Sequence, residues 1–260
     1  MYLKFIENKF NKKVQIRLVN YSGRNFFGRI CVFHKSAGHK ALYKQIDIQR
    51  KLNCVGIIIK IIRNTFATAN QAYIFYENGL ISCCIISENV FLGDSIYSGY
   101  IFNSTQNFIV QGSAIPMKYI NIFTYLNSIE YFFGSGFKFA RAAGQNATLI
   151  SKQNNEVTIK LNSGWIKKIN MNAMGCIGRN SNMLHKYDNL MKAGVNRFFG
   201  KRPTVRGIVK NPCDHPHGGG EGKNSPPAAQ VSPWGKLTKG TPTKNKKKHK
   251  KLRNLYKQTI

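Results

Sequence analysis

The stretch from Gln71 to Ile86, which reads QAYIFYENGLISCCII, carries the clearest local signal for secondary structure in this chain. Its two apolar runs, Gln71–Tyr76 and Ile81–Ile86, are separated by a short polar segment that contains Asn78-Gly79. Asn and Gly tolerate the positive φ angles of the tight turns that join antiparallel strands. An Asn-Gly pair between apolar runs is therefore a strong hairpin signal. The stretch predicts an antiparallel β-hairpin.

Short runs of the same kind lie on both sides of this hairpin. Val14–Leu18 alternates between apolar and polar residues, and Cys54–Ile62 is rich in β-branched residues. Three further runs are joined by polar turns: Ala147–Ser151, Val157–Leu161 and Trp165–Ile169. Many short strands with polar turns favour small antiparallel barrels over a parallel sheet, so we expect an all-β body. The best candidate for a helix is the short segment Asn180–Ala193.

Charge is the most informative feature of the composition. The 260 residues include 40 Lys and Arg against 10 Asp and Glu, a net charge of +30. Residues 186–260 hold 18 of the basic residues and three acids, together with most of the Pro and Gly-rich sequence, whereas the aliphatic runs lie earlier. A chain with this excess repels itself, and nucleic acid is the polyanion that offsets it best. We expect a folded body followed by a basic extension that becomes ordered on RNA.

Several classes of protein do not fit the sequence. The six Cys include no C-x-x-C pair, so neither a zinc ribbon nor a disulfide framework is indicated, and free thiols are expected. The longest apolar run, Val55–Ile62, is far shorter than the ~20 residues of a membrane span. The N-terminus lacks the apolar core of a signal peptide. We expect no membrane partner and no small-molecule substrate.

The segment His217–Lys223, HGGGEGK, superficially matches two catalytic motifs. A phosphate-binding P-loop would need Gly at 217 and Ser or Thr at 224, where this chain has His and Asn. The HGGG oxyanion loop lacks its G-x-S-x-G partner. A third possibility is a metal site formed by Cys213, Asp214, His215 and His217, although its spacing is not that of structural zinc sites. The alternative we favour is that the glycine backbone approaches RNA closely, because Gly has no Cβ.

These clusters together resemble large-subunit ribosomal protein L-two (L2) of the bacterial and organellar type. The resemblance is most specific between Lys192 and Lys223, in the runs GKRPTVRG (200–207) and DHPHGGGEGK (214–223). It resumes at Pro233-Trp234-Gly235, and weaker matches extend back to Gly23-Arg24-Asn25. The match covers residues 20–245, so it does not depend on one motif.

The resemblance implies an OB-like barrel followed by an SH3-like barrel, with extended basic N- and C-terminal segments. We place the N-terminal extension, the two barrels and the C-terminal segment at residues 1–40, 41–115, 116–185 and 186–260. The resemblance also implies that the protein is a structural constituent of the large ribosomal subunit and not an enzyme. Such a protein binds large-subunit rRNA near the peptidyl-transferase region, contacts other large-subunit proteins, and supports assembly, subunit joining and translation. No cofactor is implied beyond Mg ions carried by the RNA.

Within this picture the RNA contacts are basic, His, Asn and Gly residues that bind phosphates and sugars. The predicted RNA-binding residues are Arg24, Asn25, Arg29, His39, Lys40, Arg141, Arg197, Arg202, Arg206, Asn211, His215, His217, Gly218, Gly219, Gly220, Lys223, Lys236, Lys239 and Lys244. In the family, a histidine of the glycine loop has been proposed to aid peptidyl transfer, and here it would be His215 or His217. We expect these histidines to order RNA instead.

Three questions stay open at this stage. Phe26 and Phe27 fit core packing and base stacking equally well, whereas Tyr131-Phe132-Phe133 is expected in a barrel core.

The sequence also allows two functional classes other than a ribosomal constituent. One is an RNA-processing metallohydrolase built on Cys213, Asp214, His215 and His217, and the other is a free nucleic-acid chaperone. Ile, Asn, Lys, Phe and Tyr are abundant, as in AT-rich genomes, no import sequence is visible, and the resemblance is bacterial in type. Together these features favour an organelle-encoded mitochondrial protein, with a plastid or an AT-rich bacterium as the alternative.

Overall fold

The computed structural model describes residues 15–101, 110–221 and 229–241, which form two compact units. Unit 1 contains the described residues up to Val19 together with those from Ala41 to Asn189. Unit 2 contains Asn20–Lys40 and the described residues from Leu190 onward. Each unit therefore combines two stretches that are separated in the sequence.

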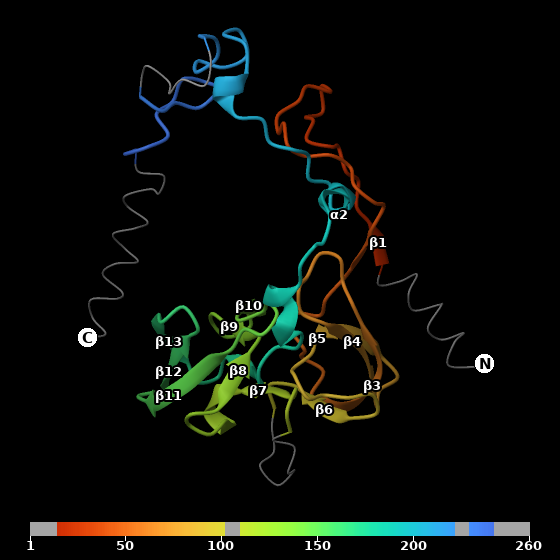
Figure 1. Ribbon diagram of the computed structural model, residues 1–260. Helices are drawn as coiled ribbons and strands as arrows, with labels where there is room; N and C mark the ends of the chain where they lie inside the picture. Colours follow the sequence, from red (N-terminus) through yellow and green to blue (C-terminus); the bar gives the residue numbers. More distant parts are fainter. Residues whose placement is uncertain (1–14, 102–109, 222–228, 242–260) are drawn as a thin grey trace, which may run out of the picture. The chain divides into compact units, whose positions relative to one another are not determined.

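The first barrel of unit 1 contains the predicted hairpin (Figure 1). The hairpin strands β4 and β5 pair antiparallel from Phe75–Ile81 at the turn to Gln71–Ile85 at the open end. Strand β3 pairs with β4 on one side and with β6 on the other, both antiparallel. These strands are β3 (Cys54–Ile62), β4 (Gln71–Tyr76), β5 (Ile81–Ile85) and β6 (Ser95–Ser98). The hairpin prediction is confirmed.

The second barrel is built from shorter strands. The predicted three-strand meander is present as β11, β12 and β13, paired antiparallel in chain order. The strands of this barrel are β7 (Ala114–Pro116), β8 (Tyr125–Asn127), β11 (Ala147–Gln153), β12 (Glu156–Leu161), β13 (Ile166–Asn170) and β14 (Met174–Ile177). The remaining unit 1 elements are β1 (Gln15–Arg17), β2 (Leu42–Lys44), β9 (Ile129–Glu130), β10 (Phe137–Phe139) and the 3-10 turns η1 (Met117–Tyr119) and η2 (Met183–Tyr187).

One ten-stranded sheet runs through both barrels, in the order β13-β12-β11-β8-β14-β7-β6-β3-β4-β5. The join is the parallel pairing of β6 with β7 at Ser98 and Ala114. Each barrel has its own apolar core, represented by Ile74 and Ile96 in the first and by Leu126 and Ile159 in the second. The mostly-β architecture, with sheets that fit an OB-like and an SH3-like barrel, confirms the predicted fold class.

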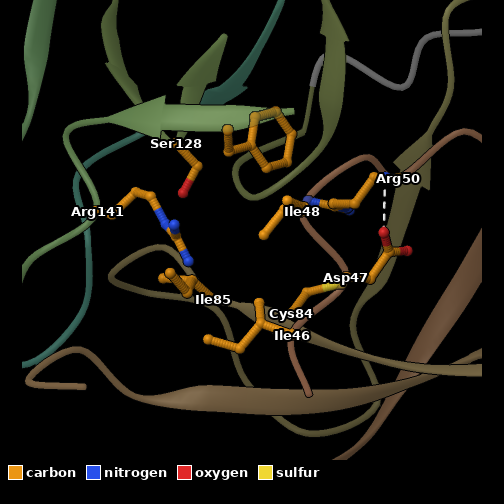
Figure 2. Close-up of a pocket in the computed structure, with 9 residues that line it drawn as sticks. Ile46, Asp47, Ile48, Arg50, Cys84, Ile85, Ser128 and Arg141 are labelled. Carbon is orange, nitrogen blue, oxygen red and sulfur yellow. Dashed lines mark hydrogen bonds between the residues drawn. The ribbon is translucent and has the colours of Figure 1, made fainter. Parts of the chain in front are cut away.

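A buried arginine lies where the two barrels meet. Arg50 is 1% exposed, and its guanidinium donates hydrogen bonds to Ser98 Oγ (2.9 Å), Gly112 O (2.8 Å) and Tyr97 O (3.2 Å). The Asp47 carboxylate accepts a hydrogen bond from the Arg50 backbone N–H (3.0 Å), which stabilises the left-handed turn at Arg50 (φ 47°; Figure 2). The guanidinium also donates to Cys176 Sγ on β14 (3.4 Å), so one side chain satisfies acceptors from both barrels.

Burial opposes the positive charge of Arg50, because it removes the guanidinium from water. The neighbouring Cys176, Cys84 and Tyr76 groups act in the opposite direction and hold the pKa of Arg50 above its ordinary value. The pKa of the Cys84 thiol is itself raised by burial to about 11. All six Cys are free thiols. Arg50 is therefore a charged structural group in the interior.

Two local predictions were wrong. The expected helix at Asn180–Ala193 is absent: η2 covers only Met183–Tyr187, and the helix α2 begins at Ala193 and ends at Phe198. Tyr131, Phe132 and Phe133 are exposed and do not enter a core.

The exposed aromatic turn follows from its buried neighbour Glu130. The Glu130 carboxylate is inaccessible to solvent and accepts hydrogen bonds from Tyr100 Oη (2.8 Å), Gly136 N (3.0 Å) and Met174 N (3.0 Å). Because a buried carboxylate needs such donors, these bonds hold the start and the end of the turn against the body. The residues between them project outward.

Candidate nucleic-acid interface

Unit 2 is held together by a pairing between residues 34–39 and residues 198–202. Ser36 N donates to Gly200 O (2.8 Å), His39 N to Phe198 O (3.0 Å), and Arg202 N to His34 O (2.8 Å). The two segments run alongside each other next to α2 (Figure 1). Two basic segments from opposite ends of the sequence therefore form one surface.

Two glycines permit this close pairing. A Cβ on Gly38 would lie 2.6 Å from Phe198 O, and a Cβ on Gly200 would lie 2.7 Å from Ser36 O. Both glycines have positive φ angles, 67° and 76°, which side chains rarely adopt. Any larger residue at either position would separate the segments.

Unit 2 contains no apolar core among the residues that the structure describes. The buried apolar side chains of the described chain all lie between Ile58 and Ile177, in unit 1. The described residues of unit 2 carry twelve Lys and Arg against two acids, Asp214 and Glu221. A segment with so little apolar burial and so much charge gains stability chiefly from a partner of opposite charge.

Most predicted RNA contacts lie in unit 2 with accessible side chains. Among the predicted residues, those classed as exposed are Arg24, Arg29, His39, Lys40, Arg197, Arg202, Arg206, Asn211, Gly219, Gly220, Lys236 and Lys239. Asn25 is partly buried, and its side chain accepts a hydrogen bond from Arg29 N (3.0 Å). The His39 ring contacts that of Phe198, with centroids 4.6 Å apart. Lys223 and Lys244 lie outside the described residues.

The three glycines of the glycine loop (residues 215–220) have two different roles. A Cβ on Gly218 would meet Asn211 O at 2.3 Å, and one on Gly219 (φ 84°) would meet Pro212 Cγ at 2.7 Å. These two glycines are needed for the loop's own packing. Gly220 (φ 85°) has nothing within 4 Å of its Cβ position. Of the three, Gly220 has the open surroundings that a ligand's backbone could approach.

Both histidines of this loop act as hydrogen-bond acceptors within the protein. His215 Nδ1 accepts from His217 N (2.9 Å), and His217 Nε2 accepts from Val231 N (3.1 Å). Their rings lie with centroids 4.9 Å apart. Burial, together with the nearby His217 and Lys210 charges, lowers the pKa of His215 from its ordinary value. The loop therefore favours neutral His215 and uses both rings to hold its shape.

The residues proposed for a metallohydrolase do not assemble into a metal centre. Within residues 15–101, 110–221 and 229–241, no group of three or more His, Cys, Asp or Glu side chains is placed to hold a metal ion.

No helix in the described part of the chain is long and apolar enough to cross a membrane.

Arg141 is the one predicted contact that belongs to unit 1. It follows β10, and its side chain points into a small pocket lined by Ile85, Ser128 and other residues (Figure 2). The loop around it is held by Asn180, whose side-chain amide donates to Ala140 O (2.6 Å) and Ala142 O (2.9 Å). Asn180 was not predicted as a functional residue, because no local pattern signals a buried amide that positions a distant loop.

Comparison with known proteins gives concordant matches over both parts of the chain. The family model described as "Ribosomal Proteins L2, RNA binding N-terminal domain" matches residues 11–98, and "Ribosomal Proteins L2, C-terminal domain" matches residues 110–235. The large ribosomal subunit protein uL2 of Buchnera aphidicola is 42% identical over 231 residues, which cover 88% of this chain and 82% of the relative. The large ribosomal subunit protein uL2m of Reclinomonas americana is 38% identical over 243 residues, which cover 93% of this chain and 86% of the relative.

Proposed function

The chain belongs to the L2 family of large-subunit ribosomal proteins, and from that premise we propose that unit 2 is its main surface for large-subunit rRNA. A member of this family is a structural constituent of the large ribosomal subunit that binds RNA and serves translation. The observation that carries the proposal is the glycine-dependent pairing of residues 34–39 with 198–202. This pairing gathers basic side chains on a unit whose described residues form no apolar core.

The proposed contacts position the protein and do not read base sequence. Arg24, Arg29, Arg197, Arg202 and Arg206 are exposed, and guanidinium groups bind phosphates with two parallel hydrogen bonds. Lys236 and Lys239 add charge, and Gly220 offers backbone to a sugar or phosphate. Such contacts recognise the shape of folded RNA.

We propose further that the glycine loop lies near the peptidyl-transferase region, and that the chain supports subunit assembly and joining alongside other large-subunit proteins. Catalysis of peptidyl transfer is assigned to the RNA. Both His215 Nδ1 and His217 Nε2 accept hydrogen bonds from the protein backbone, which gives both rings a structural role. Magnesium ions, where present, belong to the RNA.

Replacement of His217 by Gln separates the structural role from a catalytic one. The Gln side chain keeps a hydrogen-bond acceptor for Val231 N but has no group that titrates near neutral pH. Large subunits assembled with His217→Gln are expected to form peptide bonds at the wild-type rate and with an unchanged pH profile. A loss of rate that remains after full assembly would overturn the structural assignment.

Sedimentation tests whether the chain is a subunit constituent or a free RNA chaperone. In a lysate from the native source at moderate salt, the chain is expected to migrate with the large subunit. Recovery of most of the chain at the top of the gradient, with free proteins, would support a chaperone instead.

We propose the mitochondrial ribosome as its location, with the chain encoded in the organelle. The composition points to an AT-rich genome, and relatives include both bacterial uL2 proteins and the uL2m protein of Reclinomonas americana. Mass spectrometry of purified organellar ribosomes tests this directly. Peptides of the chain in plastid or bacterial ribosomes, and none in mitochondrial ones, would contradict it.

A further inference from the structure

Residues 24–30 of unit 2 form a small hairpin with two aromatic residues at its tip. Arg24 and Ile30 form an isolated antiparallel bridge, and Asn25 N donates to Arg29 O (2.9 Å). Gly28 N closes the turn by donating to Asn25 O (3.0 Å), with Gly28 in a left-handed conformation (φ 78°). The two residues at the tip of this turn are Phe26 and Phe27.

Both tip residues are exposed far beyond what is usual for aromatic side chains. Phe26 is 86% exposed and Phe27 is 72% exposed. Their ring centroids are 3.8 Å apart with an interplanar angle of 36°, so the two rings contact each other. Core packing, one of the two roles that the sequence allowed for them, is therefore excluded. Exposing two phenyl rings to water is unfavourable, and an adjacent pair of this kind indicates a binding site.

The charges around the tip indicate what binds there. Arg24 and Arg29 flank the two rings in sequence, and residues 20–40 contain four Lys and Arg and no acid. A protein partner that buried this tip would have to offset these charges with its own acids. RNA supplies phosphates for the arginines and, where it is unpaired, a flat base for the rings. Paired bases are stacked inside a helix, so an unpaired nucleotide is required.

We propose that Phe26 and Phe27 stack on an unpaired nucleotide of large-subunit rRNA while Arg24 and Arg29 bind the adjacent phosphates. This inference rests on the proposed function, and it adds an aromatic contact to an interface otherwise made by charge and backbone. It also adds two residues to the RNA-binding set predicted from the sequence. The hydrogen-bonded turn fixes the backbone that carries the rings before binding, so little backbone entropy is lost when a base stacks on them.

The test uses the full chain with both tip residues replaced by Leu, which keeps apolar bulk but removes the flat π face. Stacking contributes about 1–3 kcal/mol per base, so affinity for large-subunit rRNA is expected to fall about 5- to 150-fold. Chemical probing of the rRNA is expected to show one unpaired nucleotide that wild-type protein protects and the variant leaves reactive. Replacing both residues by Trp is expected to restore protection. The matched control is Phe91→Leu, which alters an exposed phenyl ring of unit 1.

The possible outcomes distinguish failure of the stacking proposal from failure of the proposed binding to large-subunit rRNA. If the Leu variant binds and protects rRNA as well as the wild-type chain, stacking is wrong while RNA binding stands. If the tip cross-links to a ribosomal protein and Leu substitutes for Phe without loss, the site is an apolar protein contact and stacking is again wrong. If the wild-type chain itself fails to bind large-subunit rRNA, the proposed function fails first.

Discussion

At the scale of single residues, Arg50 shows how one side chain can join two barrels. Its guanidinium donates to acceptors on Ser98, Tyr97 and Gly112, and none of these acceptors can reach water while the barrels stay packed. Replacing Arg50 by Met keeps much of the volume but removes all three of these buried hydrogen bonds. We expect the free energy of unfolding to fall by about 2–4 kcal/mol.

Chemical denaturation of the full chain measures this loss. Arg63→Met provides the control, because Arg63 is exposed, and exposed substitutions change stability by about 0.5 kcal/mol or less. An Arg50→Met variant as stable as the control would show that the guanidinium bonds contribute nothing net.

His215 is expected to titrate below the ordinary histidine value of ~6.5 in the free protein. Burial is the first cause, and the His217 and Lys210 charges reinforce it. Because the folded loop favours the neutral ring, its stability is fully present above pH ~6.5. It is lost as pH falls through the lower pKa of the folded state. NMR titration of the imidazole gives this pKa, and exchange of the His217 amide reports the bond that protonation breaks. A pKa at or above the ordinary value would contradict the neutral-acceptor role.

At the scale of elements, Gly200 decides whether the two segments of unit 2 can pair. In Gly200→Ala the new Cβ would overlap Ser36 O at 2.7 Å, and the positive φ would add strain. The same substitution at Gly194, in α2, meets nothing within 4 Å and serves as the matched control. We expect Gly200→Ala to destabilise the pairing by about 2 kcal/mol or more. Hydrogen exchange of the Ser36 amide, which donates to Gly200 O, should quicken in Gly200→Ala alone. Equal protection in both variants would refute the pairing.

Local patterns predicted some elements to the residue and missed others entirely. The bounds of β3 and β4 match the runs at 54–62 and 71–76, because a β-branched run and an apolar run that leads into an Asn-Gly turn each carry a local signal. Strand β1 lies within the predicted run Val14–Leu18, whereas other short strands, such as β7 and β9, were not predicted. Their pairing depends on partners far away in the sequence, and no local run marks them.

The RNA-binding role of the candidate residues stays a prediction, but the structure shows where they lie and what they contact. Motif resemblance identified the basic and Gly residues, most of which the structure places on unit 2. It could not show that Gly218 and Gly219 serve the loop's own packing, because that depends on Asn211 and Pro212 folding back. It also misassigned Tyr131–Phe133, since an aromatic run indicates burial unless a partner such as Glu130 holds the turn outward.

At the scale of the whole molecule, we expect charge to govern the affinity of the chain for rRNA. Neutralising each phosphate releases counterions, so binding that uses about six to ten phosphates should weaken about 10³- to 10⁵-fold between ~50 and ~200 mM salt. Unit 2 has twelve Lys and Arg in its described residues, enough for that number of contacts. Filter binding of the isolated chain to large-subunit rRNA across this range measures the slope. A flat response would contradict an electrostatic interface.

The most direct single measurement is ultraviolet cross-linking in native large subunits, with the linked peptides mapped by mass spectrometry. If unit 2 is the RNA interface, rRNA cross-links should fall in both 20–40 and 190–241, the two segments that pair through Gly38 and Gly200. Cross-links confined to the barrels of unit 1, with none in either segment, would contradict it.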